Sequence, residues 1–256
     1  MIEKFRKYHY ALIAFIGVLT ITGLNAAPLK ILDFKSNQLS PLVQQQVCKN
    51  LASLCHEKST LLSIAVDHGE LWILSQNKIV QFKQQHHQLK LQQQWEISIP
   101  ENDEFASVSH YIYPKLFPVA QQRYAIARID EYSETYSEGG AHIERASFYG
   151  LRTDGQLKSL INNYPFSFNR IIRACFSERD YATSDGNCHD EDQLTLDIRP
   201  INPMQWQFRY HYNLKLSPAS DSQQKSHQGN RVINIDLTHI PTQPDIPEAW
   251  NFHGQD

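Results

Sequence analysis

The stretch MQWQFRYHYNLKL, residues 204–216, alternates between aromatic and polar side chains. The aromatic positions are Trp206, Phe208, Tyr210 and Tyr212, and the residues between them are Gln205, Gln207, Arg209 and His211. Successive side chains of a β-strand point to opposite faces, so this pattern predicts a strand with one buried aromatic face and one solvated face.

Short runs of the same kind fill most of the chain. LLSIAV, ELWILS, KIVQFK and LKLQQQWEIS lie within residues 61–98 and are separated by polar turns. RYAIARIDEYSE and ERASFYGLRT predict two long strands joined through Gly139 and Gly140, and further strands are expected at 156–161, 170–176, 193–201 and 231–237. The fold expected is mainly β, about a dozen strands in antiparallel meanders that form a sandwich or a partial propeller-like body.

One helix is expected before this body, at residues 40–57, which read SPLVQQQVCKNLASLCHE. Ser40 is a suitable N-cap and Pro41 suits the first helical position. Val43, Val47, Leu51 and Leu54 recur at helical spacing on one face, whereas the opposite face is rich in glutamine. This pattern predicts a short amphipathic helix docked on the core.

The N-terminal segment has the layout of a secretory signal peptide. Lys4, Arg6 and Lys7 precede an apolar stretch at 11–23, and the expected cleavage site follows Ala26. An uncleaved anchor is the alternative, although the apolar stretch is shorter than the roughly 20 residues that span a bilayer. We therefore predict export to the periplasm, with no stable membrane span after cleavage.

The expected organisation divides the chain into four parts. These are a signal peptide at 1–26, an N-terminal extension and helix at 27–60, an antiparallel β body at 61–240 and an extended proline-rich tail at 241–256. Within the body, 61–100 and 105–240 are candidate sub-sheets.

Export makes the four cysteines, Cys48, Cys55, Cys175 and Cys188, candidates for disulfides. Four cysteines allow three pairings, and the simplest is local, Cys48 with Cys55 and Cys175 with Cys188. Residues seven apart on a continuous helix have Cα atoms about 10.5 Å apart, whereas a disulfide needs at most about 7 Å. A Cys48–Cys55 bridge therefore requires the helix to end or turn near residues 49–50.

Composition excludes several classes of function. The formal net charge is −3, and removal of the signal peptide takes away three basic residues and one acidic residue to leave −5. An acidic chain has no electrostatic footprint for nucleic acid. The sequence has neither a glycine-rich phosphate loop nor a Gly-x-Ser-x-Gly elbow, and its 12 histidines lack metal-ligand spacing. We expect no cofactor and no metal.

Two acidic segments are candidates for partner binding. The first is a glycine-containing loop expected at 130–144, and the second is a loop expected at 185–192 beside a cysteine. The residues assigned to this role are Glu131, Tyr132, Glu134, Tyr136, Glu138, His142, Glu144, Asp190 and Asp192. In the second segment Asp185 and Asn187 begin like a calcium loop, but the later positions do not follow that pattern, so a solvated loop is the competing interpretation.

These features favour an exported, non-catalytic binding protein. Net negative charge steers such a protein toward a basic partner, most sharply as an inhibitor or immunity-type protein that neutralises a basic wall-degrading enzyme or toxin in the periplasm. One alternative is a periplasmic hydrolase of peptidoglycan or polysaccharide that uses two carboxylates from Asp130, Glu131, Glu134, Glu138 and Glu144 as acid and base. Another is a structural component of the envelope, which would present an exposed edge strand or apolar patch.

Overall fold

The computed structural model describes residues 29–36, 39–56, 62–66, 69–100 and 108–251, together with the backbone but not the side chain of Tyr136. The predicted signal peptide and its cleavage site lie outside these residues. Within them the chain is mainly β, as the alternating runs predict, and every strand pairing is antiparallel.

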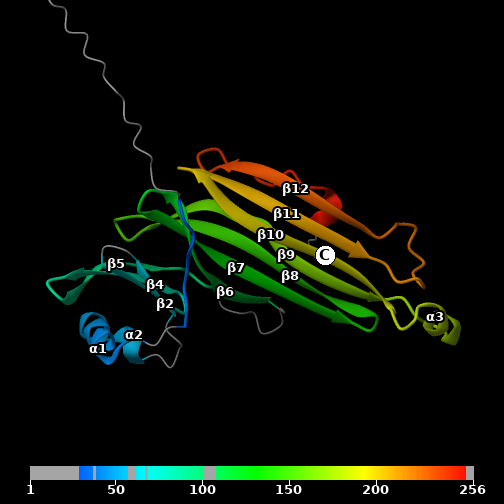
Figure 1. Cartoon of the computed structure of the whole chain (residues 1–256), viewed down its shortest axis with the longest axis horizontal. Coiled ribbons are helices and arrows are strands. Elements are labelled where there is room, and N and C mark those ends of the chain that lie inside the picture. Colours follow the sequence, from blue (N-terminus) through cyan, green and yellow to red (C-terminus); the bar gives the residue numbers. More distant parts are fainter. Residues whose placement is uncertain (1–28, 37–38, 57–61, 67–68, 101–107, 252–256) are drawn as a thin grey trace, which may run out of the picture.

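The strands form two sheets (Figure 1). The larger has the order β1 (Leu32–Asp33), β6 (Val108–Ala120), β7 (Arg123–Tyr136), β8 (Gly139–Leu151), β9 (Leu157–Arg173), β10 (His189–Asn202), β11 (Gln205–Lys215) and β12 (His227–Asp236). The smaller is a meander of β2 (Leu62–Val66), β3 (Glu70–Ser75), β4 (Lys78–Gln85) and β5 (Gln88–Glu96).

The predicted N-terminal helix is present, and it turns where the cysteines require it to. Helix α1 (Pro41–Asn50) begins after Ser40, whose Oγ accepts a hydrogen bond from the Val43 amide, and α2 (Ser53–His56) follows after a break. The break brings the Cα atoms of Cys48 and Cys55 within 5.7 Å, and the two residues form a disulfide. The geometric condition derived from the sequence is therefore met.

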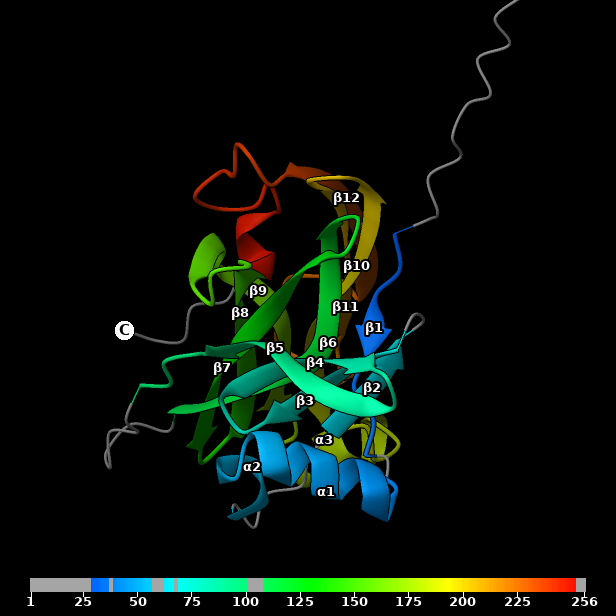
Figure 2. The ribbon, with the colours of Figure 1, turned by 90° about the vertical axis from the view of Figure 1, so that its left-hand side faces the viewer.

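The small sheet lies between these helices and the large sheet (Figure 2). Val47 and Leu54 of the helices pack with Ile73, Val80 and Phe82 on one face of the sheet. On the other face, Trp72 stacks on Trp95, and their cluster includes side chains of β6, β7 and β8. Burial of apolar surface on both faces ties the helical segment and the small sheet to the rest of the molecule.

The large sheet folds over on itself around the aromatic face of β11. Strands β9 and β10 pair only between residues 167–173 and 189–195, which leaves β10–β12 free to pack against β6–β8 beyond that point. Phe148 of β8 contacts Trp206 and Phe208, and the Trp206 indole donates a 2.8 Å hydrogen bond to the carbonyl of Pro118 in β6. Trp206, Phe208, Tyr210 and Tyr212 are all buried, as the alternation predicts.

Several elements differ from those expected. Strand β6 was not predicted, because its two prolines, Pro114 and Pro118, are unfavourable in a strand; both lie where the pairing with β7 shifts register. The strands expected at 156–161 and 170–176 are parts of one continuous strand, β9. The tail is not simply extended, because it contains a 3₁₀ helix, η1 (Glu248–Trp250), and its Trp250 ring stacks on Tyr212.

Candidate functional site

The first acidic segment is a hairpin and not a loop. Strands β7 and β8 run through it, and only Ser137 and Glu138 lie between them. The loop expected at 130–144 is therefore wrong. The strand expected at RYAIARIDEYSE, residues 123–134, is present as the main part of β7, and only the expectation of a loop across 130–144, which was based on its glycines and polar side chains, fails.

The hairpin register divides the predicted binding residues between two faces. Glu131 lies opposite Glu144, and His142 lies opposite Ser133, so these side chains share one face, which we call the polar face. The alternate positions Tyr132 and Glu134 belong to the opposite face. Glu138 lies in the turn, and the side chain of Tyr136 is outside the description. The residues therefore share one end of the sheet without forming a single surface.

On the polar face the two glutamates form an ordered cluster with residues of neighbouring strands. Glu131 accepts a 2.6 Å hydrogen bond from the Ser109 hydroxyl and lies 3.5 Å from Nδ1 of His142. Glu144 accepts hydrogen bonds from the hydroxyls of Tyr111, at 2.7 Å, and Ser167, at 2.6 Å. Donors from this chain thus fix both carboxylates.

The pKa of Tyr111 reflects both its burial and the negative charge of this cluster. Burial raises the pKa of the Tyr111 phenol well above its ordinary value, and its hydrogen bond to the Glu144 carboxylate and the charge of Glu144 raise it further. The phenol therefore stays protonated and donates to Glu144. A general acid or base must present its reacting oxygen to a substrate, whereas here those oxygens already face donors, so the arrangement suits a fixed negative surface better than proton transfer.

A hollow of about 490 Å³ opens at the end of the polar face. Its lining includes Ser133, Glu138, His142, Asn169, Arg173 and His189. The Arg173 amide donates to the Glu138 carbonyl at 2.6 Å, and Arg173 pairs with His189 across β9 and β10. The hairpin and the start of β10, which are distant in sequence, therefore meet here.

The second acidic segment is only partly available to a partner. The Asp190 carboxylate accepts hydrogen bonds from the Ser217 amide, at 2.8 Å, and from the Ser220 hydroxyl, at 2.6 Å, so it stabilises the turn after β11. Asp192 is buried and pairs with Arg170 of β9. Asp192, which the sequence analysis assigned to partner binding, therefore does not present its carboxylate at the surface, because its charge is paired inside the protein.

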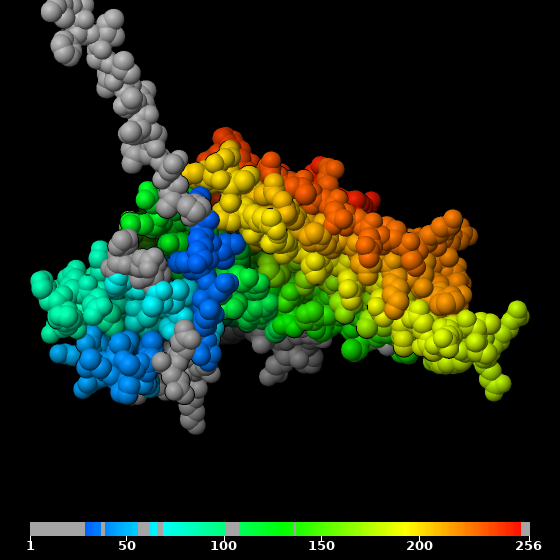
Figure 3. Space-filling model, in the orientation of Figure 1, coloured from blue at the N-terminus to red at the C-terminus, as the bar shows by residue number. Residues whose placement is uncertain are grey.

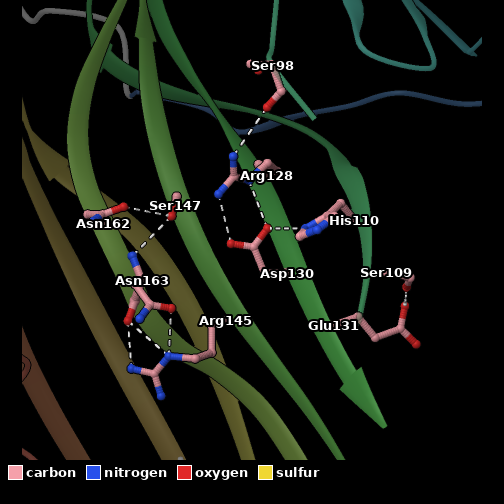
Figure 4. A network of polar contacts seen from close by, with 10 residues as sticks. All are labelled: Ser98, Ser109, His110, Arg128, Asp130, Glu131, Arg145, Ser147, Asn162 and Asn163. Atoms are coloured by element: carbon pink, nitrogen blue, oxygen red, sulfur yellow. Dashed lines mark hydrogen bonds and ion pairs between the residues drawn. The ribbon is translucent and has the colours of Figure 1, made fainter. Parts of the chain in front are cut away.

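A second polar network includes Asp130, one of the carboxylates considered for catalysis (Figure 4). Asp130 is buried on the face opposite Glu131, 2.9 Å from the Arg128 guanidinium and 2.7 Å from Nδ1 of His110. Burial favours the neutral form of Arg128, but the hydrogen bond and charge of Asp130 outweigh it and raise the pKa of Arg128. Asp130 is thus the buried counter-ion of a partly buried cation, Arg128, and is separated from Glu131 and Glu144 by the sheet.

The segment between Cys175 and Cys188 contains a helix that was not predicted from the sequence. These cysteines form a disulfide that closes a loop with helix α3 (Glu178–Thr183). Ser177 and Asp180 form a capping box, in which the Ser177 side chain accepts from the Asp180 amide and the Asp180 carboxylate accepts from the Ser177 amide. The spacing Ser-x-x-Asp was the available signal for this helix.

The end of the large sheet that holds both segments is strongly acidic. We call residues 131–144 and 170–192 the acidic end; strand pairing of β8 with β9 and of β9 with β10 brings them together. These residues include ten acidic and three basic side chains, a net charge of −7. Because the whole chain carries −3, all other residues together carry +4, which becomes +2 once the predicted signal peptide is removed and the chain carries −5.

Comparison of this chain with models of known protein families, with curated proteins and with solved structures finds no match. Among the described residues, no helix is long and apolar enough to cross a membrane. The same residues contain no group of three or more His, Cys, Asp or Glu side chains arranged to hold a metal ion. The acidic end is therefore the feature of this chain that bears most directly on its function.

Proposed function

We propose that this chain is an exported, non-catalytic binding protein whose acidic end docks on a basic protein in the periplasm. The observation that carries the proposal is the charge distribution: a net −7 at one end of a chain that is otherwise net positive. Such an asymmetry orients an approaching cationic surface and raises its association rate. The most specific version of this proposal is an inhibitor or immunity-type protein that neutralises a wall-degrading enzyme or toxin.

The frame of the acidic end supports recognition. Its charged side chains project from paired strands and from a loop closed by a disulfide, so little ordering is needed on binding. The two disulfides are consistent with an exported protein in an oxidising compartment. The hydrolase alternative is less well supported, because Asp130 is on the other face from Glu131 and Glu144 and is paired with Arg128.

Calorimetric titration with single purified proteins tests the proposal. The mature chain, residues 27–256, is titrated with a panel of basic wall hydrolases, egg-white lysozyme among them, and with an acidic wall hydrolase as counter-probe. We expect at least one basic enzyme to bind with 1:1 stoichiometry and to lose activity, and the acidic enzyme not to bind. Binding is expected to weaken as salt concentration rises.

Charge reversal provides the control. Glu134→Lys with Glu138→Lys changes the acidic end without touching the bonded Glu131, and we expect at least a tenfold loss of affinity. Glu96→Lys with Glu248→Lys makes the same charge change at exposed positions elsewhere and is expected to have less than a threefold effect. Failure of every basic enzyme to bind, or equal losses in both variants, would overturn the proposal. Peptidoglycan hydrolysis by the chain alone would favour the hydrolase alternative.

A further inference from the structure

The loop closed by Cys175 and Cys188 projects from the acidic end, beyond the last paired residues of β9 and β10 (Figures 1 and 3). We call residues 175–188 the α3 knob. Its interior is fixed by the disulfide, and the buried Ser184 hydroxyl lies 3.3 Å from the sulfur of Cys175 and 3.2 Å from that of Cys188. The capping box of Ser177 and Asp180 fixes its helix. The knob is therefore a preorganised protrusion.

Two large aromatic side chains lie on this protrusion and are exposed to solvent. Phe176 is 60% exposed and Tyr181 is 50% exposed. Both contact Arg173, the last residue of β9: its guanidinium carbon lies 5.3 Å from the Phe176 ring centroid, and its Nη2 donates a 3.2 Å hydrogen bond to the Tyr181 hydroxyl. Ile171, which is 39% exposed, precedes them on the polar face. The four side chains form one patch, the aromatic patch.

This composition is that of an interface centre and not of an ordinary solvated loop. Aromatic residues and arginine dominate the few positions that carry most of the binding energy in protein interfaces, and a rim of polar residues excludes water around them. Here Glu138 borders the patch, and the knob itself carries Glu178, Asp180 and Asp185 against one basic residue, Arg179. An acidic rim around an aromatic centre complements a pocket that is apolar inside and basic at its edge.

We infer that the α3 knob is the element that enters the partner's pocket, with Phe176 and Tyr181 as anchors. The inference rests on the proposed function and adds the mode of binding: charge at the acidic end guides the encounter, and the aromatic patch holds the complex. The occupant is a basic protein with a concave site, because acidic charge beside the patch disfavours an anionic lipid surface and a second acidic copy of this chain.

Kinetic binding measurements separate the two contributions. The mature chain with Phe176→Ser and Tyr181→Ser is compared with the wild type against the same panel of basic wall hydrolases, by surface-based kinetics. We expect at least a tenfold loss of affinity that appears mainly as faster dissociation, whereas Glu134→Lys with Glu138→Lys mainly slows association. Leu42→Ser with Val232→Ser is the matched control, because Leu42 and Val232 are similarly exposed, at 65% and 55%, away from the acidic end.

The outcomes distinguish this inference from the proposed function. If the knob variant binds like the wild type while the charge variant does not, the inference is wrong and the proposed function stands. If the wild type binds no basic enzyme, both fail. Sedimentation of the wild type and of the knob variant, each alone, provides the remaining check. A wild type that is dimeric and a knob variant that is monomeric would make the patch a self-association surface and overturn the inference. Unchanged thermal unfolding and intact disulfides show that the variant is folded.

Discussion

Gly229 has no side chain, and the space this leaves is occupied by the Trp250 ring of the C-terminal tail. Gly229 lies opposite Tyr212, where the Trp250 ring of the tail stacks on Tyr212 at a centroid distance of 5.0 Å. A Cβ built at Gly229 would come within 2.3 Å of the Trp250 ring. We expect Gly229→Ala to displace Trp250 and to lower the free energy of unfolding by about 1–3 kcal/mol, the usual cost of overpacking. Denaturant unfolding followed by tryptophan fluorescence measures the change.

A second background separates this clash from other effects of the added methyl group. Once Trp250→Ala has removed the ring, Gly229→Ala has nothing to collide with there, and its cost is expected to fall to within about 0.5 kcal/mol of zero, as for an uncoupled surface change. An undiminished cost in the Trp250→Ala background would contradict the packing explanation and indicate that the strand itself resists the substitution.

At the scale of an element, the start of helix α3 depends on the charge of one carboxylate. The amide of Phe176 donates a hydrogen bond to Asp180, as do the side chain and amide of Ser177, and these bonds hold the pKa of Asp180 below its ordinary value of 3.8. A lowered pKa in the folded state means that the stabilisation is complete above the unfolded value and is lost as the pH falls through the folded one. The cap of α3 is therefore expected to loosen only under strongly acidic conditions.

Amide exchange at Phe176 and Ser177, measured as a function of pH, tests this linkage. Protection in the wild type, corrected for the intrinsic exchange rate, is expected to fall as the pH drops below about 4, the ordinary range of an aspartate. In Asp180→Asn the protection is lower at neutral pH and no longer changes over the acidic range. The amides in the middle of β11 serve as the internal reference, and a parallel fall there would mean global acid unfolding instead.

Elements in which apolar and polar side chains alternate regularly could be predicted from the sequence, and those in which this alternation is interrupted could not. The alternation in 204–216 correctly gave β11 and its buried face, because burial on one side imposes period two. In β6 the two prolines broke the pattern, and only the bulges beside them make the strand possible. In the hairpin, a strand was expected over 123–134, but the glycines and polar side chains of 130–144 also suggested a loop there. The buried Ala141 and Ile143, which alternate with His142 and Glu144, mark the strand that the loop interpretation overlooked.

The candidate site depended on contacts that one segment of sequence does not contain. Glu131 meets Glu144 only because the register of β7 and β8 aligns them. The role of Asp192 is set by Arg170, which lies 22 residues earlier in the chain. The two residues meet because β9 and β10, which the α3 knob joins, pair with each other. The acidic segments were nevertheless expected to matter together, and strand pairing places them at one end. Composition thus drew attention to the two acidic segments, and tertiary pairing decided which of their carboxylates face outward.

At the scale of the whole molecule, the small sheet is joined to the large one through a pair of stacked indoles. Trp72 of β3 and Trp95 of β5 lie 5.6 Å apart, and Trp72 also meets Tyr124 of β7 edge to face. The Trp95 Nε1–H donates a 2.8 Å hydrogen bond to the carbonyl of Arg152 beyond β8. The buried Nε1 of Trp72 has no hydrogen-bond partner among the described residues.

This asymmetry predicts different results from the same substitution. Trp95→Phe removes one of the two hydrogen bonds to the Arg152 carbonyl, which keeps the bond from the Gly155 amide. It is expected to cost about 0.5–1.5 kcal/mol more than Trp72→Phe, which removes an unpaired buried donor along with some contact area. Guanidinium unfolding of both variants, followed by far-UV circular dichroism and by fluorescence, gives the two free energies. Coincident transitions would show that the sheets unfold as one cooperative unit. Equal costs for the two variants would mean that packing alone, without the Trp95–Arg152 bond, docks the small sheet.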